Sequence, residues 1–308
     1  MVVCFGSVIT LGATATHISA ATLRHFSSIS MRKTALITGP TSGIGRFTAL
    51  ELARRGYDLI LVARNAAKAR QLQMEIGNAV STGFVQCDLS SIASVKEAVE
   101  EIKAGYQHID LLINNAGLIV QHRQTSVDGI ELTFATNHLG PFILTTGLVD
   151  LLKAAESAKV VNLASAAHFF AFRYQTTKLA NPPHYHDLVI YSRTKLANIL
   201  FSNELSERLA PFGITSNAVH PGTVSSSFAG DGNGVTAWFM KFFKPLLRTP
   251  QQAAADIVNV ATAPELNDIT GQYFAHSKPA RSSGKAKNRA LARELWAFSE
   301  ALADVVLI

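Results

Sequence analysis

The sequence predicts an α/β protein with a doubly wound parallel sheet in three layers, because short apolar segments alternate with helix-like segments along most of the chain. The apolar segments are continuous rather than alternating with polar residues, which is typical of parallel strands covered on both faces. A glycine-rich turn follows the first of them, at a position where such sheets bind ligands. No linker interrupts the pattern, so residues 31–308 are expected to form a single domain.

The expected elements follow one another from Met31. Each expected strand is a short apolar run that ends in a turn, and these runs are residues 33–38, 58–64, 83–88, 109–117, 158–165 and 214–222. Helices are expected at 43–56, 67–77, 94–105, 131–153 and around Tyr191, with a bend in the fourth at Pro141. Residues 181–187 contain two prolines and are expected to form a loop.

Composition and charge restrict the function classes. The chain has 308 residues, of which 48% are hydrophobic and 16% charged, and this composition suits a globular protein with a sizeable core. The net charge is +6, but the basic residues form no single stripe and no aromatic–basic repeat is present, so nucleic-acid binding is not predicted. Two cysteines, Cys4 and Cys87, are too few for a disulfide framework. No metal site is predicted, because His184 and His186 lack a third ligand at a suitable spacing.

Residues 1–30 differ from the rest of the chain. They contain no acidic residue, they are rich in Ser and Thr, and polar residues interrupt their apolar character, so they make a poor membrane span and no firm anchor. Arg24, shortly before Ser27, is typical of a mitochondrial transit peptide. We expect a leader or disordered segment and a mitochondrial location. The alternatives are a true start at Met31 with a cytoplasmic location, or association with the endoplasmic reticulum membrane.

Glycines and polar residues stand at the carboxyl ends of the predicted strands. After the first strand, Gly39, Gly43 and Gly45 allow the backbone to approach a pyrophosphate, and the following helix N-terminus supplies N–H donors. Asp88 ends the third strand, where a carboxylate can accept from an adenine amino group. The two amides Asn114 and Asn115 end the fourth strand, and they either tie neighbouring strands or contact a cofactor ribose. These residues together predict a dinucleotide site.

The end of the second strand indicates which dinucleotide is bound. An NAD enzyme usually places an acid here for the ribose hydroxyls, but this strand ends with Ala63 and Arg64. An arginine can accommodate a 2′-phosphate, and such a charge-assisted contact contributes about 1.5–3 kcal/mol. NADP(H) is therefore the expected cofactor. The alternative is that Arg64 is an ordinary exposed arginine.

Tyr191 and Lys195 are four residues apart on an expected helix, so their side chains lie on the same face. Lowering a tyrosine pKa from near 10 to about 7 requires roughly 4 kcal/mol. One ammonium group ~4 Å away supplies about that energy at an effective dielectric constant near 20. The spacing therefore predicts that Lys195 makes Tyr191 a proton carrier at neutral pH. The alternative is two surface residues on an amphipathic helix.

Over about residues 33–275 the chain resembles the short-chain dehydrogenase/reductase superfamily. The resemblance rests on four motifs that occur in the same order as in that superfamily, namely TGPTSGIG, NNAG, Ser165 and YSRTK. The segments NHLGPFILT and YSRTKLANILFSNELSERL resemble its retinol-dehydrogenase and WW-domain-oxidoreductase-like branch. The resemblance implies a Rossmann fold. It also implies that Tyr191 is the general acid/base, that Lys195 lowers its pKa and binds the nicotinamide ribose, that Ser165 polarises the substrate oxygen and that Asn137 belongs to a proton relay.

The resemblance also completes the cofactor site. It implies that Val224 holds the carboxamide through its backbone, and Ser226 stands where a threonine is common, which leaves its role in doubt. The residues assigned to the cofactor are Gly39, Ser42, Gly43, Ile44, Gly45, Arg64, Asp88, Leu89, Asn114, Asn115, Ala116, Tyr191, Lys195, Pro221, Val224 and Ser226.

We therefore expect an NADP(H)-dependent alcohol dehydrogenase or carbonyl reductase. The apolar run 237–247 corresponds to part of the family's substrate lid, and residues 166–187 would form the other wall of the substrate site, which favours a lipophilic small molecule. A homodimer is left open. The competing interpretation is a non-catalytic dinucleotide-binding regulator on the same fold. The presence of Ser165, Tyr191 and Lys195 together favours the enzyme.

Overall fold

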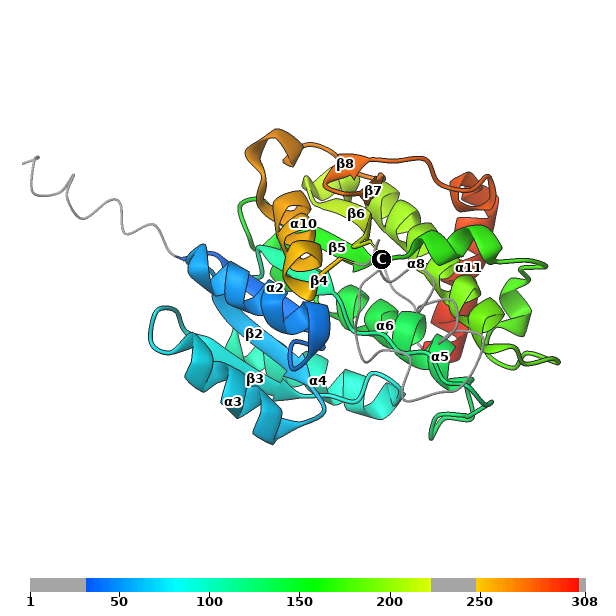
Figure 1. Cartoon of the computed structure of the whole chain (residues 1–308), viewed down its shortest axis with the longest axis horizontal. Helices are drawn as coiled ribbons and strands as arrows, with labels where there is room; N and C mark the ends of the chain where they lie inside the picture. The colour runs from blue at the N-terminus through cyan, green and yellow to red at the C-terminus, as the bar shows by residue number, and fades with distance from the viewer. Residues whose placement is uncertain (1–31, 223–247, 305–308) are drawn as a thin grey trace, which may run out of the picture. The chain divides into compact units, whose positions relative to one another are not determined.

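The computed structural model describes residues 32–222 and 248–304, and Figure 1 shows their course. Within these residues the strands form one eight-stranded sheet of order β3-β2-β1-β4-β5-β6-β7-β8. Neighbours are parallel except β7 and β8, which are antiparallel. This is the predicted doubly wound Rossmann arrangement, and the strand order reverses between β1 and β4. The strands are β1 (Thr34–Thr38), β2 (Asp58–Ala63), β3 (Thr82–Gln86), β4 (Leu111–Asn114), β5 (Lys159–Leu163), β6 (Thr215–His220), β7 (Tyr273–Ala275) and β8 (Lys278–Pro279).

Helices cover both faces of the sheet, each over its own hydrophobic cluster. On one face lie α2 (Gly43–Arg54), α3 (Ala66–Ile76) and α10 (Pro250–Thr262). On the other lie α4 (Ile92–Gly105), α6 (Gly140–Gly147) and α8 (Asp187–Leu209), with α11 (Arg289–Ala303) packed against α8. The shorter helices are α5 (Leu132–Phe134), η1 (Ala135–Leu139), α7 (Val149–Lys153), η2 (Ala166–Phe170), η3 (Thr176–Lys178), η4 (Ala210–Phe212), η7 (Pro264–Leu266) and η8 (Lys285–Lys287).

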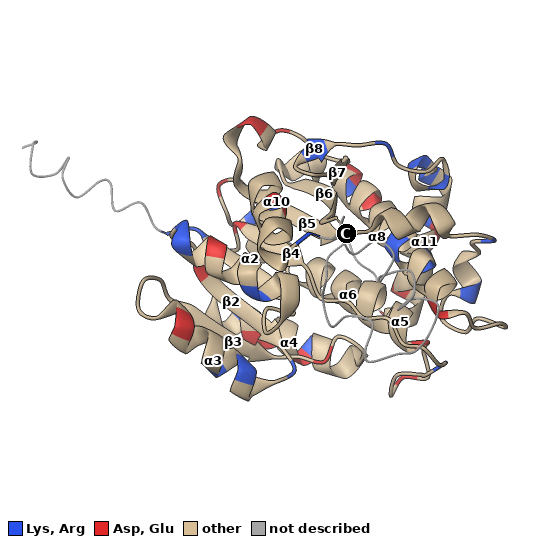
Figure 2. Ribbon diagram, viewed as in Figure 1, with Lys and Arg blue, Asp and Glu red and all other residues tan. Residues whose placement is uncertain are grey.

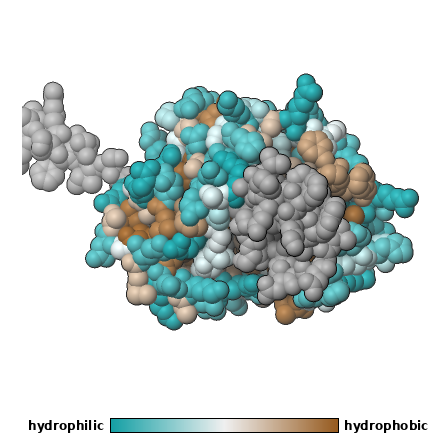
Figure 3. All heavy atoms as spheres, viewed as in Figure 1, coloured by the Kyte–Doolittle hydropathy of each residue, from teal (hydrophilic) through white to brown (hydrophobic). Residues whose placement is uncertain are grey.

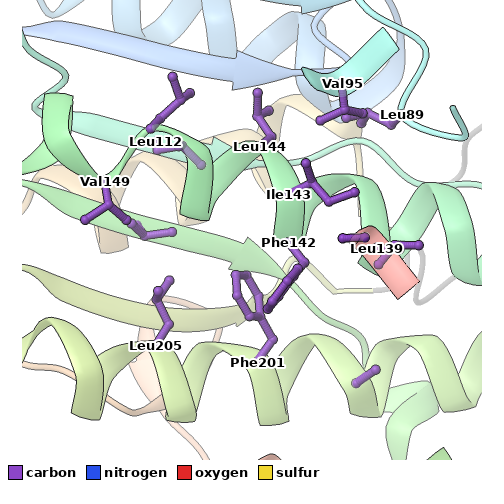
Figure 4. Close-up of a cluster of buried hydrophobic side chains, with 14 of the residues drawn as sticks. Leu89, Val95, Leu112, Leu139, Phe142, Ile143, Leu144, Val149, Phe201 and Leu205 are labelled. Atoms are coloured by element: carbon purple, nitrogen blue, oxygen red, sulfur yellow. The ribbon is translucent and has the colours of Figure 1, made fainter. Parts of the chain in front are cut away.

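Strand β1 shows why continuous apolar sequence gives a doubly covered sheet. All five of its residues are buried. Leu36 packs in the cluster beneath α4, α6 and α8, whereas Ala35 and Ile37 pack in the cluster beneath α2. Figure 4 shows part of the first cluster, in which the rings of Phe142 from α6 and Phe201 from α8 lie 5.6 Å apart. The core therefore fixes α6 and α8 beside each other under the sheet.

The segment 131–153 is less regular than the single bent helix predicted from Pro141. It is divided into α5, a π-helical segment η1, α6 and α7. Pro141 lies in the first turn of α6, where its missing N–H disturbs no intrahelical bond. The irregularity instead comes from the π turn, a feature often found at functional sites, and Asn137 lies within it.

Two strands and two helices near the C-terminus were not predicted. β7 and β8 have only three and two residues, too few for a recognisable pattern. A signal for α10 was present, because Thr249 and Gln252 form a capping box at its start. No helix in the described part of the chain has the length and apolar character needed to cross a membrane. The predicted leader 1–30 and lid 237–247 lie outside the described residues.

Candidate active site

The ends of β1 and β4 are tied together where the strand order reverses. The Thr38 hydroxyl accepts hydrogen bonds from the backbone N–H groups of Asn115 and Ala116, both at 3.0 Å. The Asn115 side chain donates in return to the carbonyl oxygens of Thr38 at 2.8 Å and Gly39 at 3.1 Å. Ligands bind beyond the strand ends at such a switch point. These bonds therefore fix one wall of the candidate site.

The glycine turn between β1 and α2 packs tightly against Asn115. A Cβ atom at Gly45 would lie 2.2 Å from the Gly39 carbonyl oxygen and 2.4 Å from the Asn115 side-chain nitrogen, so only glycine fits. Gly39 and Gly43 have φ values of +64° and +52°, which glycine adopts without strain. Ser42 stands at the N-cap of α2 but makes no side-chain capping bond, and the first turn contains no acid. An anion can therefore approach the first N–H groups of the helix.

Two other residues assigned to the cofactor make their contacts inside the protein. The buried Asn114 amide donates to the Thr145 hydroxyl at 2.8 Å and to the Asn162 side-chain oxygen at 2.9 Å, so it ties β4 to α6 and β5. Ile44 packs against the hydrophobic cluster beneath α2. The sequence left open whether Asn114 and Asn115 tie strands, and in the structure both side chains do.

The ends of β2 and β3 carry the residues assigned to the adenosine part. Arg64 is exposed directly after β2, and it forms no ion pair with any other residue that the structure describes. Asp88 is half-buried after β3 and accepts from both the backbone and the hydroxyl of Ser90. The next residue, Leu89, is buried with its carbonyl oxygen against Gly140, where a Cβ atom would be only 2.2 Å away.

Ser165 and Tyr191 meet between the end of β5 and the first turns of α8. Ser165 caps η2, where its hydroxyl accepts from the backbone of Ala167 at 3.1 Å. Burial raises the pKa of Tyr191 to about 12, and a hydrogen bond with the Ser165 side chain opposes this rise. The sequence predicted a Tyr191 pKa near neutrality. The structure differs because burial outweighs the groups that favour the phenolate.

Lys195 is buried with a side-chain ammonium group that has a neutral partner. Only 4% of the residue is exposed, and its Nζ atom donates to the Leu163 carbonyl oxygen at 3.0 Å. The Asn198 side chain donates to the same oxygen at 2.9 Å. The Lys195 Nζ atom lies 5.5 Å from the centre of the Tyr191 ring. Burial lowers the pKa of Lys195 to about 8, so this residue titrates much closer to neutrality than an exposed lysine.

Asn137 connects the π turn to α8. Its side chain accepts from the Leu118 N–H at 2.7 Å and donates to the Leu118 carbonyl at 2.9 Å. It also donates to the Thr194 hydroxyl at 3.2 Å, and Thr194 in turn donates to the Tyr191 carbonyl at 2.8 Å. The four residues predicted to be catalytic therefore come together around β4, β5 and α8.

His168 is a site residue that the sequence analysis missed. It is buried beneath Ser165, where its Nδ1 atom lies 2.7 Å from the Ser165 carbonyl oxygen. Its Nε2 atom lies 3.1 Å from the Ser283 backbone nitrogen, which can only donate. These two contacts require a neutral imidazole with its proton on Nδ1, and burial also lowers its pKa. The one sequence feature that could have indicated His168 is its position three residues after Ser165.

The end of β6 supplies the last part of the predicted site. Pro221 is buried, and Gly222 has a φ of +85°. Arg248 lies against Gly222, because a Cβ atom there would be 2.6 Å from the Arg248 Cδ atom. Val224 and Ser226, both assigned to the cofactor, lie outside the described residues. No group of three or more metal-ligating side chains occurs within ranges 32–222 and 248–304.

A model of the short-chain dehydrogenase family matches residues 33–233, which include the glycine turn, Ser165, Tyr191 and Lys195. The chain belongs to the short-chain dehydrogenase family. The match covers more than half of the chain, and the site geometry comes from the same residues that carry the family motifs.

Two curated relatives and one solved structure show which members of the family this short-chain dehydrogenase resembles. Human retinol dehydrogenase 13 is 36% identical over 290 residues, covering 88% of this chain and 84% of the relative. The chloroplastic short-chain dehydrogenase TIC 32 A of Brassica napus is 39% identical over 285 residues, covering 88% of each. The 3-ketoacyl-(acyl-carrier-protein) reductase of Brucella melitensis, complexed with NADH, has a TM-score of 0.61 at 26% identity, covering 79% of this chain and 96% of that one. The chain is similar to the retinol-dehydrogenase-like branch of the family.

This short-chain dehydrogenase is an oxidoreductase that interconverts alcohols and carbonyls with a nicotinamide dinucleotide. The glycine turn fits such a cofactor, because Gly39 and Gly45 allow the turn to pack closely against Asn115 and Ala116 and the α2 N-terminus is not capped by a side chain. Arg46, near the start of α2, pairs with Glu75.

Proposed function

We propose that this protein is an NADP(H)-dependent carbonyl reductase or alcohol dehydrogenase in which Tyr191 transfers the proton. The observation that supports this proposal most strongly is the Ser165–Tyr191 hydrogen bond beside the buried Lys195 ammonium. A substrate oxygen held by the Ser165 and Tyr191 hydroxyls would meet two donors at the edge of the sheet that also carries the glycine cradle.

Each catalytic residue has a separate role in this proposal. The cofactor supplies or accepts the hydride. Tyr191 donates its phenolic proton to the substrate oxygen during reduction and takes it back from the alcohol during oxidation. Ser165 holds the same oxygen, and the Lys195 ammonium stabilises the phenolate that remains on Tyr191. Because the Tyr191 pKa is raised to about 12, the phenol carries at neutral pH the proton that carbonyl reduction requires.

The preference for NADP(H) rests on Arg64. It is exposed at the end of β2 with no acidic neighbour in the strand end, so its guanidinium is available for a 2′-phosphate. The preference is tested by measuring kcat/KM with NADPH and with NADH over a panel of carbonyl substrates. The wild type is expected to favour NADPH, and Arg64→Ala is expected to lower kcat/KM for NADPH about tenfold while leaving NADH unchanged.

Arg70→Ala is the matched control for this test, because it removes another exposed arginine from the adjoining helix α3. Equal use of both cofactors by the wild type would contradict the assignment to NADPH. Absence of turnover with either cofactor, although both bind, would favour the non-catalytic dinucleotide-binding regulator.

The substrate and location are proposed in coarser terms. An apolar substrate is supported by the name of the relative retinol dehydrogenase 13 and by the predicted apolar lid at 237–247. An organelle location is supported by the composition of residues 1–30 and by the chloroplastic relative from Brassica napus. Residues 31–308 are proposed as the catalytic domain. N-terminal sequencing of the protein isolated from cells distinguishes cleavage near Ser27 from translation that starts at Met31.

A further inference from the structure

Three phenylalanine side chains are exposed in one short loop beside the catalytic serine. The exposed fractions of Phe169, Phe170 and Phe172 are 50%, 54% and 59%. In the described part of the chain only seven large hydrophobic residues are 40% or more exposed, and these three are the only ones gathered within four consecutive positions. We call Phe169, Phe170 and Phe172 the aromatic patch. Figure 3 shows brown side chains near the segment that precedes α8 in Figure 1.

The loop that carries the aromatic patch is held rigidly by buried contacts. Ala171, in its middle, is only 2% exposed and packs into the core beneath α8. His168, at its base, is fixed by a hydrogen bond that Nδ1 donates to the Ser165 carbonyl and one that Nε2 accepts from the Ser283 N–H. The aromatic patch is therefore carried by a segment that buried contacts hold in place. Its phenyl rings point outward because the small Ala171 and the imidazole of His168 occupy the inward positions.

The backbone N–H and carbonyl groups of Ala171 and Phe172, at the tip of this loop, have partners within the protein. The N–H of Ala171 donates to the His168 carbonyl at 3.3 Å, and that of Phe172 donates to the Phe170 carbonyl at 2.7 Å. Lys285 donates through Nζ to the Ala171 carbonyl at 2.9 Å. Arg193 donates through Nε and Nη2 to the Phe172 carbonyl at 3.2 and 3.0 Å. Such a loop can enter an apolar medium without leaving these backbone groups unbonded, which is otherwise costly.

Basic side chains lie beside the aromatic patch, because Arg193 and Lys285 bond to its backbone and Arg173 follows it directly in the sequence. Residues 165–186, which contain it, include no acid, and neither do residues 278–293, which reach it through Lys285. Figure 2 shows blue segments along the ribbon between β8 and α11. Arg289 and Arg293 pair with Glu207, but other cations of these two segments are exposed without an ion pair to a described residue. These exposed cations are Arg173, Lys178, Lys278, Arg281, Lys285 and Lys287.

We propose that the aromatic patch and its basic surround dock this protein peripherally on the surface of an anionic lipid bilayer. The phenyl rings would lie at the level of the acyl chain boundary, and the lysine and arginine side chains would reach the phosphate groups. A bilayer fits better than a protein partner, because the tip offers three apolar rings with basic side chains beside them, and the N–H and carbonyl groups of Ala171 and Phe172 are already bonded within the protein. The patch adjoins Ser165, so the docked face is also the face that carries the reacting end of the site.

The proposal is tested by sedimenting the full chain with vesicles of phosphatidylcholine alone and of phosphatidylcholine mixed with phosphatidylglycerol. The wild type is expected to bind the mixed vesicles, and added salt is expected to weaken the binding because charge screening removes the electrostatic part. Changing Phe169, Phe170 and Phe172 together to Ser is expected to lower the partition coefficient about a hundredfold. Met74→Ser is the control, because it removes an even more exposed apolar side chain from α3. Residues 1–30 are present in every variant, so any binding that they contribute is the same throughout.

A second measurement does not depend on the folding of the triple variant. Phe170→Trp places a third indole in the chain, beside the native Trp238 and Trp296. The fluorescence difference between this variant and the wild type is expected to shift to the blue on mixed vesicles and to be quenched by brominated acyl chains. Equal vesicle binding by the wild type and the triple variant, or an indole that stays unquenched in bound Phe170→Trp protein, would overturn the proposal. A wild type that is dimeric by light scattering without lipid, with a monomeric triple variant, would show that the patch joins two copies of the chain and would also overturn it.

Discussion

The β1–β4 junction and the β5–α8 junction lie at the same edge of the sheet, but their buried polar groups are satisfied in different ways. At the first, Thr38 and Asn115 exchange hydrogen bonds with backbone groups, and no charge is buried. At the second, the Lys195 ammonium is buried against one neutral carbonyl, and Tyr191 is buried with a raised pKa. The first arrangement stabilises a binding cradle. The second is costly to folding and is explained by the proton transfer proposed for it.

The largest expected effect is at the second junction. Tyr191→Phe removes only the hydroxyl group, so carbonyl reduction is expected to fall about 10²–10⁴-fold while the Kd for NADPH changes little. Steady-state kinetics and fluorescence titration of NADPH measure the two quantities separately. Tyr106→Phe, which removes a hydroxyl group beyond the end of α4, is the control and is expected to keep full activity. Activity of Tyr191→Phe within tenfold of the wild type would show that another group transfers the proton.

A substitution at the first junction is expected to affect binding instead of chemistry. Gly45→Ala places a Cβ atom against the Gly39 carbonyl and the Asn115 amide, so one of them must move. We expect the free energy of unfolding to fall by about 1–3 kcal/mol. We expect the free energy of NADPH binding to weaken by a similar amount, which raises the Kd. Gly105→Ala is the control, because an added Cβ atom there has no neighbour within 4 Å. Calorimetric titration that gives the same Kd for both variants would mean that the turn does not hold the cofactor.

Replacing the buried Lys195 ammonium group is expected to change stability and activity in opposite directions. The pKa of Lys195 is lowered from 10.5 to about 8, so burial of its ammonium group destabilises the fold at neutral pH, and this penalty is relieved as the pH rises from about 8 to about 10.5. Lys195→Met is therefore expected to raise the free energy of unfolding at pH 7 by on the order of 1–3 kcal/mol. Its advantage over the wild type should shrink above pH 8.

The second part of the Lys195 prediction concerns the pH dependence of catalytic activity. Loss of the Lys195 ammonium removes the group that stabilises the Tyr191 phenolate, so wild-type kcat/KM for reduction is expected to decline as the pH rises above about 8. Lys195→Met is expected to be nearly inactive throughout. Urea unfolding at several pH values and a pH–rate profile test the two halves independently. A Lys195→Met variant less stable than the wild type at pH 7 would contradict the account of the buried charge.

The smallest expected effect concerns His168, which acts on catalysis only by positioning Ser165. His168→Ala removes the bond to the Ser165 carbonyl, so kcat is expected to fall about tenfold with little change in the KM for NADPH. His168→Asn keeps an N–H donor near the position of Nδ1 and is expected to recover part of the loss. If both variants lose thermal stability equally and kcat equally, His168 has a purely structural role.

The strands and the site residues were predictable to different extents. β1 to β6 were predicted within a few residues, because each is a continuous apolar run that a doubly covered sheet requires. Ser165, Tyr191 and Lys195 were predicted through motif spacing, and the structure brings them together with Asn137. β7 and β8 were missed, because their pairing depends on neighbours that are distant in sequence rather than on a local pattern.

Protonation was the property that sequence spacing predicted least well. The four-residue spacing correctly places Tyr191 and Lys195 on one face of α8, but it contains no information on how deeply that face is buried. Desolvation therefore reverses the expected direction of the Tyr191 pKa. His168 was missed for a related reason, because its two partners belong to η2 and to the C-terminal segment, and only the fold brings these together.

The contact between Gly222 and Arg248 has a consequence for how this enzyme can diversify. Arg248 lies against Gly222 and bonds to Asp256 on α10 and to His276 after β7, so its side chain joins the ends of β6, β7 and α10. One arginine side chain therefore joins three elements at this end of the sheet. Neighbouring loops can then vary and give rise to new substrate preferences on an unaltered catalytic scaffold.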